Sequence, residues 1–274
     1  MARLRYVKGP DTLAARPAVT RHTVRSLRAL YETEPAIAAA LLPRPLSPAA
    51  SGRVLVQFAD VTMQLATGAT KRVGAATVGV ACSHEGLDGY YVLAMPMEGE
   101  FVVIGGRERF GEPKKLAETQ LELDDERVRA RVTRHGITFL ELGGRLGPGA
   151  EGPRQLTERF FTYKAMPACR PDPQNHGFDG EVLLVMLTWE RDYSEVRRVE
   201  EGSVILRESP YDPLVDVPVK RLVSMELALG VSRTSGEVLR AVPGEWLAPF
   251  LVQRYDEPQA GIEVPLPCDG ASGA

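Results

Sequence analysis

The chain has 274 residues, of which 44% are hydrophobic and 25% charged, and its formal net charge is −3. This composition is typical of a globular protein with a sizeable core, and it excludes a basic field that would attract nucleic acid or an anionic membrane. No apolar run is long enough to span a bilayer, and we expect no secretory signal at the N-terminus. The three cysteines, Cys82, Cys169 and Cys268, lie far apart without a disulfide or metal pattern, so we expect a cytoplasmic protein.

The first hundred residues predict an irregular arm followed mainly by strands. Residues 1–20 are polar and contain two prolines, and a first strand is expected over 20–29. Thr33 is a candidate N-cap for a short helix over 36–42, with Pro35 in its first turn. Further strands are expected over 54–61, 90–97 and 101–104, the last because a run of Phe, Val, Val and Ile fits a buried strand.

The remainder of the chain predicts more strands and little helix. Alternating apolar residues between 121 and 142, broken by turns at Asp124-Asp125 and His135-Gly136, indicate a meander. Loops are expected over 143–149 and 170–180, strands over 182–189, 193–199, 203–206 and 217–229, a tight turn at 200–202, helical spacing over 246–255 and a flexible tail over 257–274. We therefore predict a mainly β (α+β) fold, a single domain over 1–274 built as a closed antiparallel β-barrel or cone with a few short helices.

The most unusual stretch runs from Gly105 to Leu116 and places four charges and a Pro-Lys-Lys beside the expected strand. A lysine attacks a ketone only as the free amine, and an ordinary lysine, with a pKa of about 10.4, is protonated at neutral pH. Burial in an apolar wall, here residues 101–104, Phe110 and Leu116, and a second cation both disfavour the charged form. If the segment is extended, Lys114 and Lys115 point to opposite faces and only one enters a pocket. Spacing alone leaves both a catalytic lysine and a solvated surface turn open.

Gly106-Arg107-Glu108 followed by Pro113-Lys114-Lys115-Leu116 resembles the G-R-E-x4-P-K-K-L signature of acetoacetate decarboxylases. Three further stretches resemble this family and keep its order between about residues 24 and 225: Tyr31 to Leu46, Phe161 to Pro167 and Pro213 to Lys220. The chain is identified as a member of the acetoacetate decarboxylase-like superfamily, in which the reactive lysine is a desolvated amine beside a second cation.

The resemblance implies a closed β fold with the lysine inside, a homo-oligomer, and no metal or organic cofactor. It assigns imine formation to Lys114 and modulation of that amine to Lys115. Arg107 and Glu108 are expected to pair and to orient the lysine segment. A lysine imine is an electron sink, so a bond at the adjacent carbon breaks and the electron pair moves into an enamine.

The family carries an acidic residue at one position and a basic residue at another, and both positions differ in this chain. Val78 stands where a glutamate is expected, and Val24 stands where an arginine is expected; near Val24, only His22 shares the same strand face. These valines make the pocket more apolar and alter its recognition of a carboxylate. Tyr211, which lies between two prolines beside a family-like stretch, is expected to supply a pocket hydroxyl, although a core or rim role stays open.

These features predict a lysine-imine lyase that decarboxylates a small β-keto acid. An aldolase-dehydratase, or other imine chemistry on pyruvate-type oxo acids, is the first alternative. A non-catalytic barrel that binds a small molecule is the second. The expected partner is a small oxo acid or ketone, with no nucleic acid and no membrane.

Overall fold

The structure is a computed structural model and describes residues 6, 7, 9, 19–64, 68–170, 173–258 and 260–266. Most of the expected N-terminal arm and the end of the expected tail lie outside these residues. The strands are β1 (Thr20–Glu32), β2 (Ser47–Pro48), β3 (Arg53–Gln64), β4 (Thr70–His84), β5 (Leu87–Met97), β6 (Lys114–Leu116), β7 (Glu118–Leu123), β8 (Arg127–Arg134), β9 (Ile137–Leu146), β10 (Arg154–Lys164), β11 (Val182–Leu206) and β12 (Arg221–Val242). The α-helices are α1 (Pro35–Ala40), α2 (Glu100–Phe110) and α3 (Ala248–Leu251), and short 3-10 turns cover Pro173–Asn175, Leu214–Asp216, Gly244–Trp246 and Val252–Tyr255.

All the strands belong to one sheet that closes on itself. Its order is β10-β5-β4-β3-β1-β12-β11, and β10 also pairs with β11, which completes a ring. The closure is weakest between β10 and β5, where only Phe160↔Tyr90 and Phe161↔Tyr91 pair in parallel. The predicted mainly β, cone-like fold with few short helices is confirmed. Within the residues described, no helix is long and apolar enough to cross a membrane.

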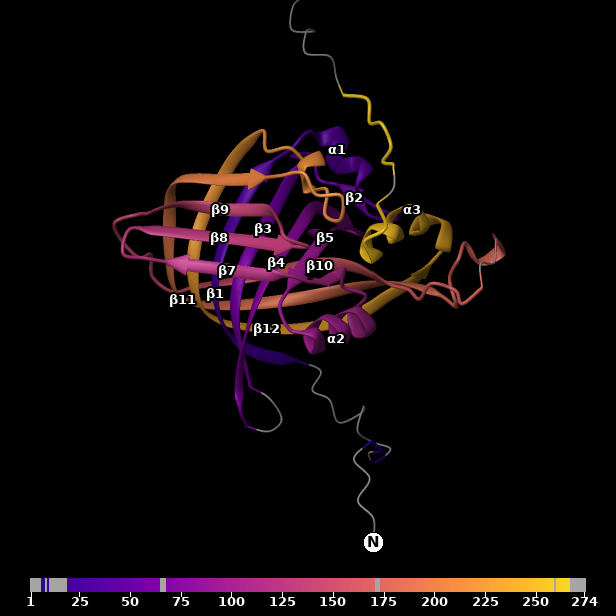
Figure 1. Ribbon diagram of the computed structural model, residues 1–274, viewed down its shortest axis with the longest axis horizontal. Helices are drawn as coiled ribbons and strands as arrows, with labels where there is room; N and C mark the ends of the chain where they lie inside the picture. Colours follow the sequence, from indigo (N-terminus) through magenta and orange to yellow (C-terminus); the bar gives the residue numbers. More distant parts are fainter. Residues whose placement is uncertain are drawn as a thin grey trace, which may run out of the picture.

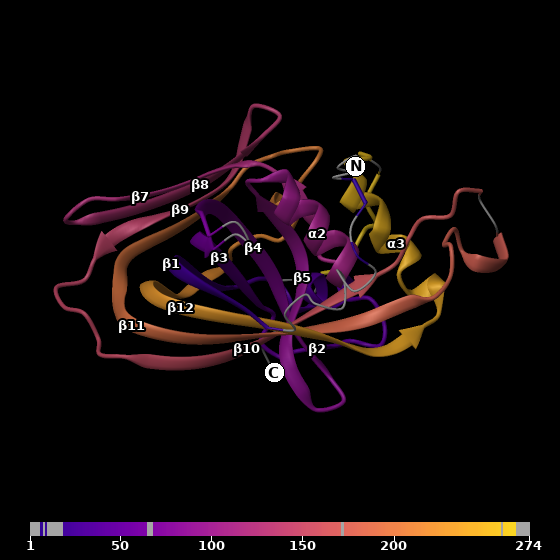
Figure 2. The ribbon, with the colours of Figure 1, turned by 90° about the horizontal axis from the view of Figure 1, so that it is seen from below.

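The meander β7–β8–β9 forms a second layer over the ring. It lies across β1, β3 and β4, and β11 bends from the ring into this layer, so that its last residues pair with β9 (Figures 1 and 2). A large apolar core fills the space between the layers and includes Leu27, Phe58 and Val78 from the ring. Because successive strand residues alternate between faces, the other face of β1, β3 and β4 looks into the cone.

Residues 101–104, predicted to form a strand, instead begin helix α2, so this prediction was wrong. Phe101 and Ile104 are 44% and 46% exposed, which a buried core strand would not allow. A four-residue apolar run cannot distinguish strand from helix by periodicity, and here the context outweighs β propensity. The helix lies beside β4 and β5 at one side of the ring (Figure 2).

The expected tight turn at 200–202 is also wrong, because β11 runs through it without a break. The pairing with β9 shifts register between Glu200 and Ser203, and Glu201 has a φ of 51°. One type of bulge places a residue at positive φ, as many tight turns do, which is why the sequence signal was ambiguous. This bulge lies in the part of β11 that pairs with β9 in the second layer.

Smaller differences concern the ends of elements. Thr33 does not cap α1; the N-cap is Glu34, without a side-chain hydrogen bond. The first part of the loop expected at 143–149 belongs to β9. Helix α3 is shorter than the helical spacing over 246–255 indicated, because 3-10 turns flank it. The meander and its turn at His135-Gly136 are confirmed.

Candidate active site

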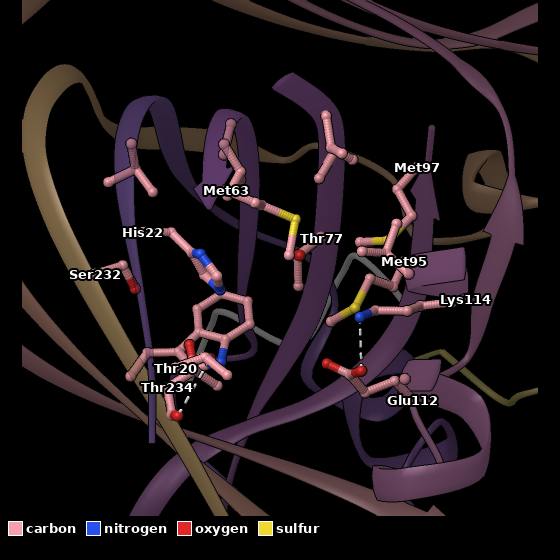
Figure 3. A pocket seen from close by; sticks show the side chains of 18 of the residues that line it. Thr20, His22, Met63, Thr77, Met95, Met97, Glu112, Lys114, Ser232 and Thr234 are labelled. Carbon is pink, nitrogen blue, oxygen red and sulfur yellow. Dashed lines mark hydrogen bonds and ion pairs between the residues drawn. The ribbon is translucent and has the colours of Figure 1, made fainter. Parts of the chain in front are cut away.

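The interior of the cone contains a cavity of about 320 Å³, and Lys114 lines it. The Lys114 side chain is 13% exposed and enters from β6, which pairs in parallel with β5. Met95, Met97 and Phe110 form an apolar surface around it, so Phe110 lies where the sequence predicted a wall. Figure 3 shows Lys114 and Glu112 on one side of this cavity and His22 and Ser232 on the other.

The end of α2 fixes the direction in which the chain leaves the helix towards Lys114. Gly111 ends the helix with a φ of 68°; its N–H donates to Arg107 O at 3.0 Å, and the N–H of Glu112 donates to Gly106 O at 3.4 Å. The bond from Gly111 is that of an αL helix C-cap, which favours glycine at the left-handed position. A Cβ on Gly111 would lie 2.2 Å from Tyr163 O. After the cap, Pro113 favours an extended backbone, so the chain enters β6 in an extended conformation.

Glu112 is the one acidic residue among those described that line the cavity, and sequence reasoning missed it. Its carboxylate is 5% exposed, and Oε2 lies 2.7 Å from the Nζ of Lys114, an ion pair without hydrogen-bond geometry. In an extended segment residues two apart share a face, so the spacing Glu112-Pro113-Lys114 was the signal that could have found it. A carboxylate at this distance is placed to exchange a proton with the amine.

Gly106 makes room for this pair. A Cβ built on Gly106 would lie 2.2 Å from Glu112 Oε2 and 2.5 Å from Lys114 Nζ. Its neighbour Gly105 also lines the cavity, but a Cβ there would meet nothing within 4 Å. The absence of a side chain at Gly106 is therefore a requirement of the Glu112–Lys114 contact.

Lys115 points away from the cavity, into a cluster of charges on the other face of β6. Its Nζ lies 2.7 Å from Asp256 Oδ1 and 3.2 Å from Asp212 Oδ1, and it donates to Tyr211 O at 2.8 Å. Arg134 completes the cluster with contacts of 2.5 Å to both carboxylates. Burial acts in the opposite direction, but hydrogen bonds from Arg134 and Lys115 hold the pKa of the Asp256 carboxyl well below its usual range. Two carboxylates compensate the charge of Lys115, so the geometry gives it an anchoring role in place of the expected modulation of Lys114.

Arg107 and Glu108 are not brought together, contrary to expectation. Arg107 Nη1 donates to Lys114 O at 3.0 Å and to Arg254 O at 3.1 Å, and its guanidinium lies 5.0 Å from the Tyr255 ring centroid. Arg107 therefore fixes the backbone of the segment that carries Lys114. Glu108 is exposed, and no ion pair joins it to another residue in the described part of the chain.

His22 and Val24 both line the cavity from β1, as the shared strand face predicted. Burial lowers the pKa of His22, and the positive charge of Lys114 acts in the same direction. The imidazole is therefore neutral at neutral pH. Its Nδ1 is buried and has no hydrogen-bond partner among the residues described.

Val78 and Tyr211 lie outside the cavity, and both expectations for them were wrong. Val78 is 1% exposed and packs in the core between the two layers, whereas Ala75 and Thr77 are the β4 residues beside it that face the cone. The family match in this stretch of β4 is loose, and an error of one residue in its register moves a side chain to the opposite face of the strand. Tyr211 stacks on His135 at 4.4 Å between ring centroids, on the Lys115 side. The hydroxyl groups that do line the cavity are those of Thr20, Thr77, Ser232 and Thr234.

Two further cations line the cavity, and sequence reasoning missed both. Arg109 comes from α2 and Arg191 from β11, so the described lining carries three cations against the single carboxylate of Glu112. Gln57 and Trp189 add polar atoms to a lining that is otherwise rich in Val, Ala and Met. A small apolar cavity with a recessed amine, a carboxylate beside it and an excess of positive charge suits an anionic carbonyl compound.

Comparisons with known proteins identify the family. The sequence model of the family "Acetoacetate decarboxylase (ADC)" matches residues 6–241. Acetoacetate decarboxylase 1 of Bradyrhizobium diazoefficiens strain USDA 110 is 32% identical over 96 residues, a match that spans 35% of this chain and 37% of that relative's length.

Solved structures show the same fold. Acetoacetate decarboxylase from Legionella pneumophila has a TM-score of 0.66 at 20% identity, covering 82% of this chain and 89% of that one. The enduracididine biosynthesis enzyme MppR, complexed with the condensation product of pyruvate and imidazole 4-carboxaldehyde, has a TM-score of 0.65 at 14% identity, covering 82% and 90%. An acetoacetate decarboxylase-like enzyme from Sphingomonas wittichii RW1 has a TM-score of 0.63 at 20% identity, covering 88% and 100%. With a family match over most of its length and this shared fold, the chain belongs to the acetoacetate decarboxylase family.

Proposed function

We propose that the protein is an imine-forming enzyme that uses Lys114 to cleave or make a carbon–carbon bond in a small oxo acid. The observation that carries this proposal is the recessed amine of Lys114, 13% exposed, in a cavity with Glu112 Oε2 at 2.7 Å. A nucleophilic lysine needs a group that accepts its proton and a poorly solvated environment; the adjacent carboxylate of Glu112 and the largely apolar lining support both.

The first candidate reaction is decarboxylation of a β-keto acid. The ammonium of Lys114 gives a proton to Glu112, the free amine adds to the ketone carbon, and water leaves as the iminium ion forms. The bond to the carboxylate then breaks, carbon dioxide leaves, and the electron pair becomes the enamine. A proton returned to carbon and the addition of water release the ketone and restore the amine. The motif retained around Lys114 supports this order of candidates.

Two groups are placed for the proton transfers. Glu112 is adjacent to the nitrogen, so we assign to it the removal and return of the amine proton. His22 lies on the opposite wall, neutral and with Nδ1 unpaired among the described residues, so we assign to it proton transfer at the substrate carbon or oxygen. Figure 3 shows that the two lie on either side of the cavity space.

A second candidate is aldol condensation followed by dehydration. The neighbour MppR was solved with the condensation product of pyruvate and an aldehyde. In this chain the specific support is the excess of cations in the cavity, because a carboxylate paired with a cation is stabilised and leaves less readily as carbon dioxide.

The two candidates are separated by their products. The protein is incubated with acetoacetate while carbon dioxide is measured, and with pyruvate and an aldehyde while the enone absorbance is measured, each with the K114M variant in parallel. We expect turnover in one assay that K114M abolishes. No turnover in either assay, together with ligand binding that K114M leaves intact, would instead support a non-catalytic binding barrel.

We also propose that the protein is a cytoplasmic homo-oligomer. Cys82 is a buried free thiol and Cys169 an exposed one, as suits a reducing compartment, while Cys268 lies outside the described residues. Helix α2 exposes the apolar side chains of Phe101 and Ile104, which favours an interface between copies. Light scattering after size exclusion tests this proposal, and a mass of 29.9 kDa would contradict it.

A further inference from the structure

A buried arginine faces Lys114 across the cavity. Arg191 on β11 is 5% exposed and lines the cavity. Its register partner on β12 is Ser232, and Ser232 in turn pairs with His22 on β1. Figure 3 shows Ser232 and His22 on the wall opposite Lys114, so this row of residues places Arg191 on that wall.

The guanidinium of Arg191 is only weakly paired with its neighbours. Its Nε is buried and has no hydrogen-bond partner in the part of the chain that the structure describes, and the nearest carboxylate oxygen, Glu158 Oε2, is 3.7 Å away. Burial lowers the pKa of Arg191, with the neighbouring Tyr193 and Glu158 acting in the opposite direction. A buried cation whose nearest carboxylate contact is this long is costly, so a guanidinium of this kind that lines a cavity is suited to bind an anion.

Trp189 adds a second donor on the same face. Residues 189 and 191 are two apart on β11, and the guanidinium carbon of Arg191 lies 4.5 Å from the Trp189 ring centroid. The indole Nε1 is buried and also has no hydrogen-bond partner within the described ranges. The ring contact restricts the guanidinium, and both side chains line the same cavity.

The charges around Arg191 do not balance. Ion pairs join Arg28 to Glu158 and Glu226, Arg154 to Glu226, and Arg191 to Glu158. Three guanidinium groups thus meet two carboxylates, which leaves one positive charge in excess. Arg191 holds only the long 3.7 Å contact and is the member of this cluster that lines the cavity.

Resting on the imine chemistry proposed above, we infer that Arg191 and Trp189 bind a carboxylate that the substrate keeps throughout the reaction. A carboxylate that accepts charge-assisted hydrogen bonds from a guanidinium is stabilised, so it is a handle for orientation and a poor leaving group. With this end anchored, the ketone carbon is directed at Lys114 on the opposite wall. The substrate class is an oxo acid that retains a carboxylate: a 2-oxo acid, or a longer oxo acid whose ketone lies further from it.

The experiment measures the concentration of a carbonyl compound that gives half-maximal borohydride trapping on Lys114. The probes are pyruvate, 4-oxopentanoate and the neutral ketone acetone. In the unmodified protein we expect at least one of the two acids to be trapped at a lower concentration than acetone. The acid with the lower half-trapping concentration shows which separation of ketone and carboxylate fits the distance between Lys114 and Arg191. In R191M we expect the half-trapping concentration of that acid to rise about 10- to 100-fold, with acetone unchanged.

R154M is the matched control, because Arg154 belongs to the same charge cluster but does not line the cavity. If R191M does not fold, R191K and W189F carry the test; W189F removes the Nε1 donor and keeps a smaller aromatic ring, and we expect a loss of about 3- to 10-fold for the acid alone. Acid trapping unchanged in R191M or W189F, or an equal loss in R154M or with acetone, overturns the inference. Absence of any acetone adduct in the unmodified protein contradicts the imine chemistry itself, which is a distinguishable result.

Discussion

Lys114 and Lys115 are adjacent in sequence and in strand, yet they occupy two chemically different regions. The cavity side of β6 gives Lys114 one carboxylate, that of Glu112, and an otherwise apolar surface. The opposite side gives Lys115 two carboxylates and a carbonyl oxygen, in a cluster shared with Arg134. The alternation of an extended segment is enough to place one amine in the cavity and the next in a cluster of charges outside it.

Removing each amine in turn is the strongest way to test this difference. K114M should lower turnover and ketone trapping by more than about 1,000-fold, because no other described amine lines the cavity. K115M should keep most of the activity but lose about 3 kcal/mol of unfolding free energy, because Asp212 and Asp256 lose a buried partner. Urea unfolding and the product assays measure both; a K115M variant that is stable and inactive would contradict the division of roles.

Glu112 gives the next largest effect. E112Q keeps the shape of the side chain but cannot take the amine proton, so kcat should fall about 100- to 1,000-fold. The control is E108Q, which changes an exposed glutamate near the end of the same helix and should leave kcat within about twofold. Equal kcat values for the two variants would remove Glu112 from the mechanism.

The two glycines of α2 offer a finer comparison. G106A would place a methyl group 2.2 Å from Glu112 Oε2 and 2.5 Å from Lys114 Nζ, so the pair must shift and kcat should fall about 10- to 100-fold. G105A meets open space and should keep the activity while raising the free energy of unfolding by up to about 1 kcal/mol. Steady-state rates and thermal unfolding distinguish the two variants. An inactive G105A would show that any added side chain on this part of α2 lowers activity, whether or not it meets the Glu112–Lys114 pair.

The smallest effect concerns the pH dependence of the Lys115 region. The folded-state pKa of Asp256 is below its usual range, so its ion pairs stabilise the fold above the unfolded pKa of about 3.9 and this contribution is lost as the pH falls further. D256N should therefore cost about 2 kcal/mol at about pH 6 and clearly less at about pH 3. Urea unfolding at both pH values tests this, and a cost that does not shrink at the lower pH would mean that Asp256 acts through packing.

The sequence allowed the fold class and the placement of a lysine of the Pro-Lys-Lys motif in a pocket to be predicted, for two different reasons. Alternation and turns mark the strands directly, and the motif around Gly106 to Leu116 marks the family. Helix α2 was missed because a short apolar run has no period to measure. Val78 was misplaced because a shift of one residue reverses the face of a strand.

The rest of the site depends on strands that are distant in sequence. Arg191, Ser232 and His22 form one row only because β11, β12 and β1 pair in a particular register. The excess positive charge around Arg191 likewise follows from ion pairs between β1, β10, β11 and β12. Glu112 is the exception, since its spacing from Lys114 was visible in the sequence.

Lys114 lies in the cavity and Lys115 does not, and site-resolved trapping measures the consequence of this difference directly. The protein is treated with acetone and borohydride, digested, and the modified lysine is located by mass spectrometry. An isopropyl adduct on Lys114, with Lys115 unmodified under the same conditions, is the predicted result. Adducts on Lys115, or equal modification of both lysines, would contradict it.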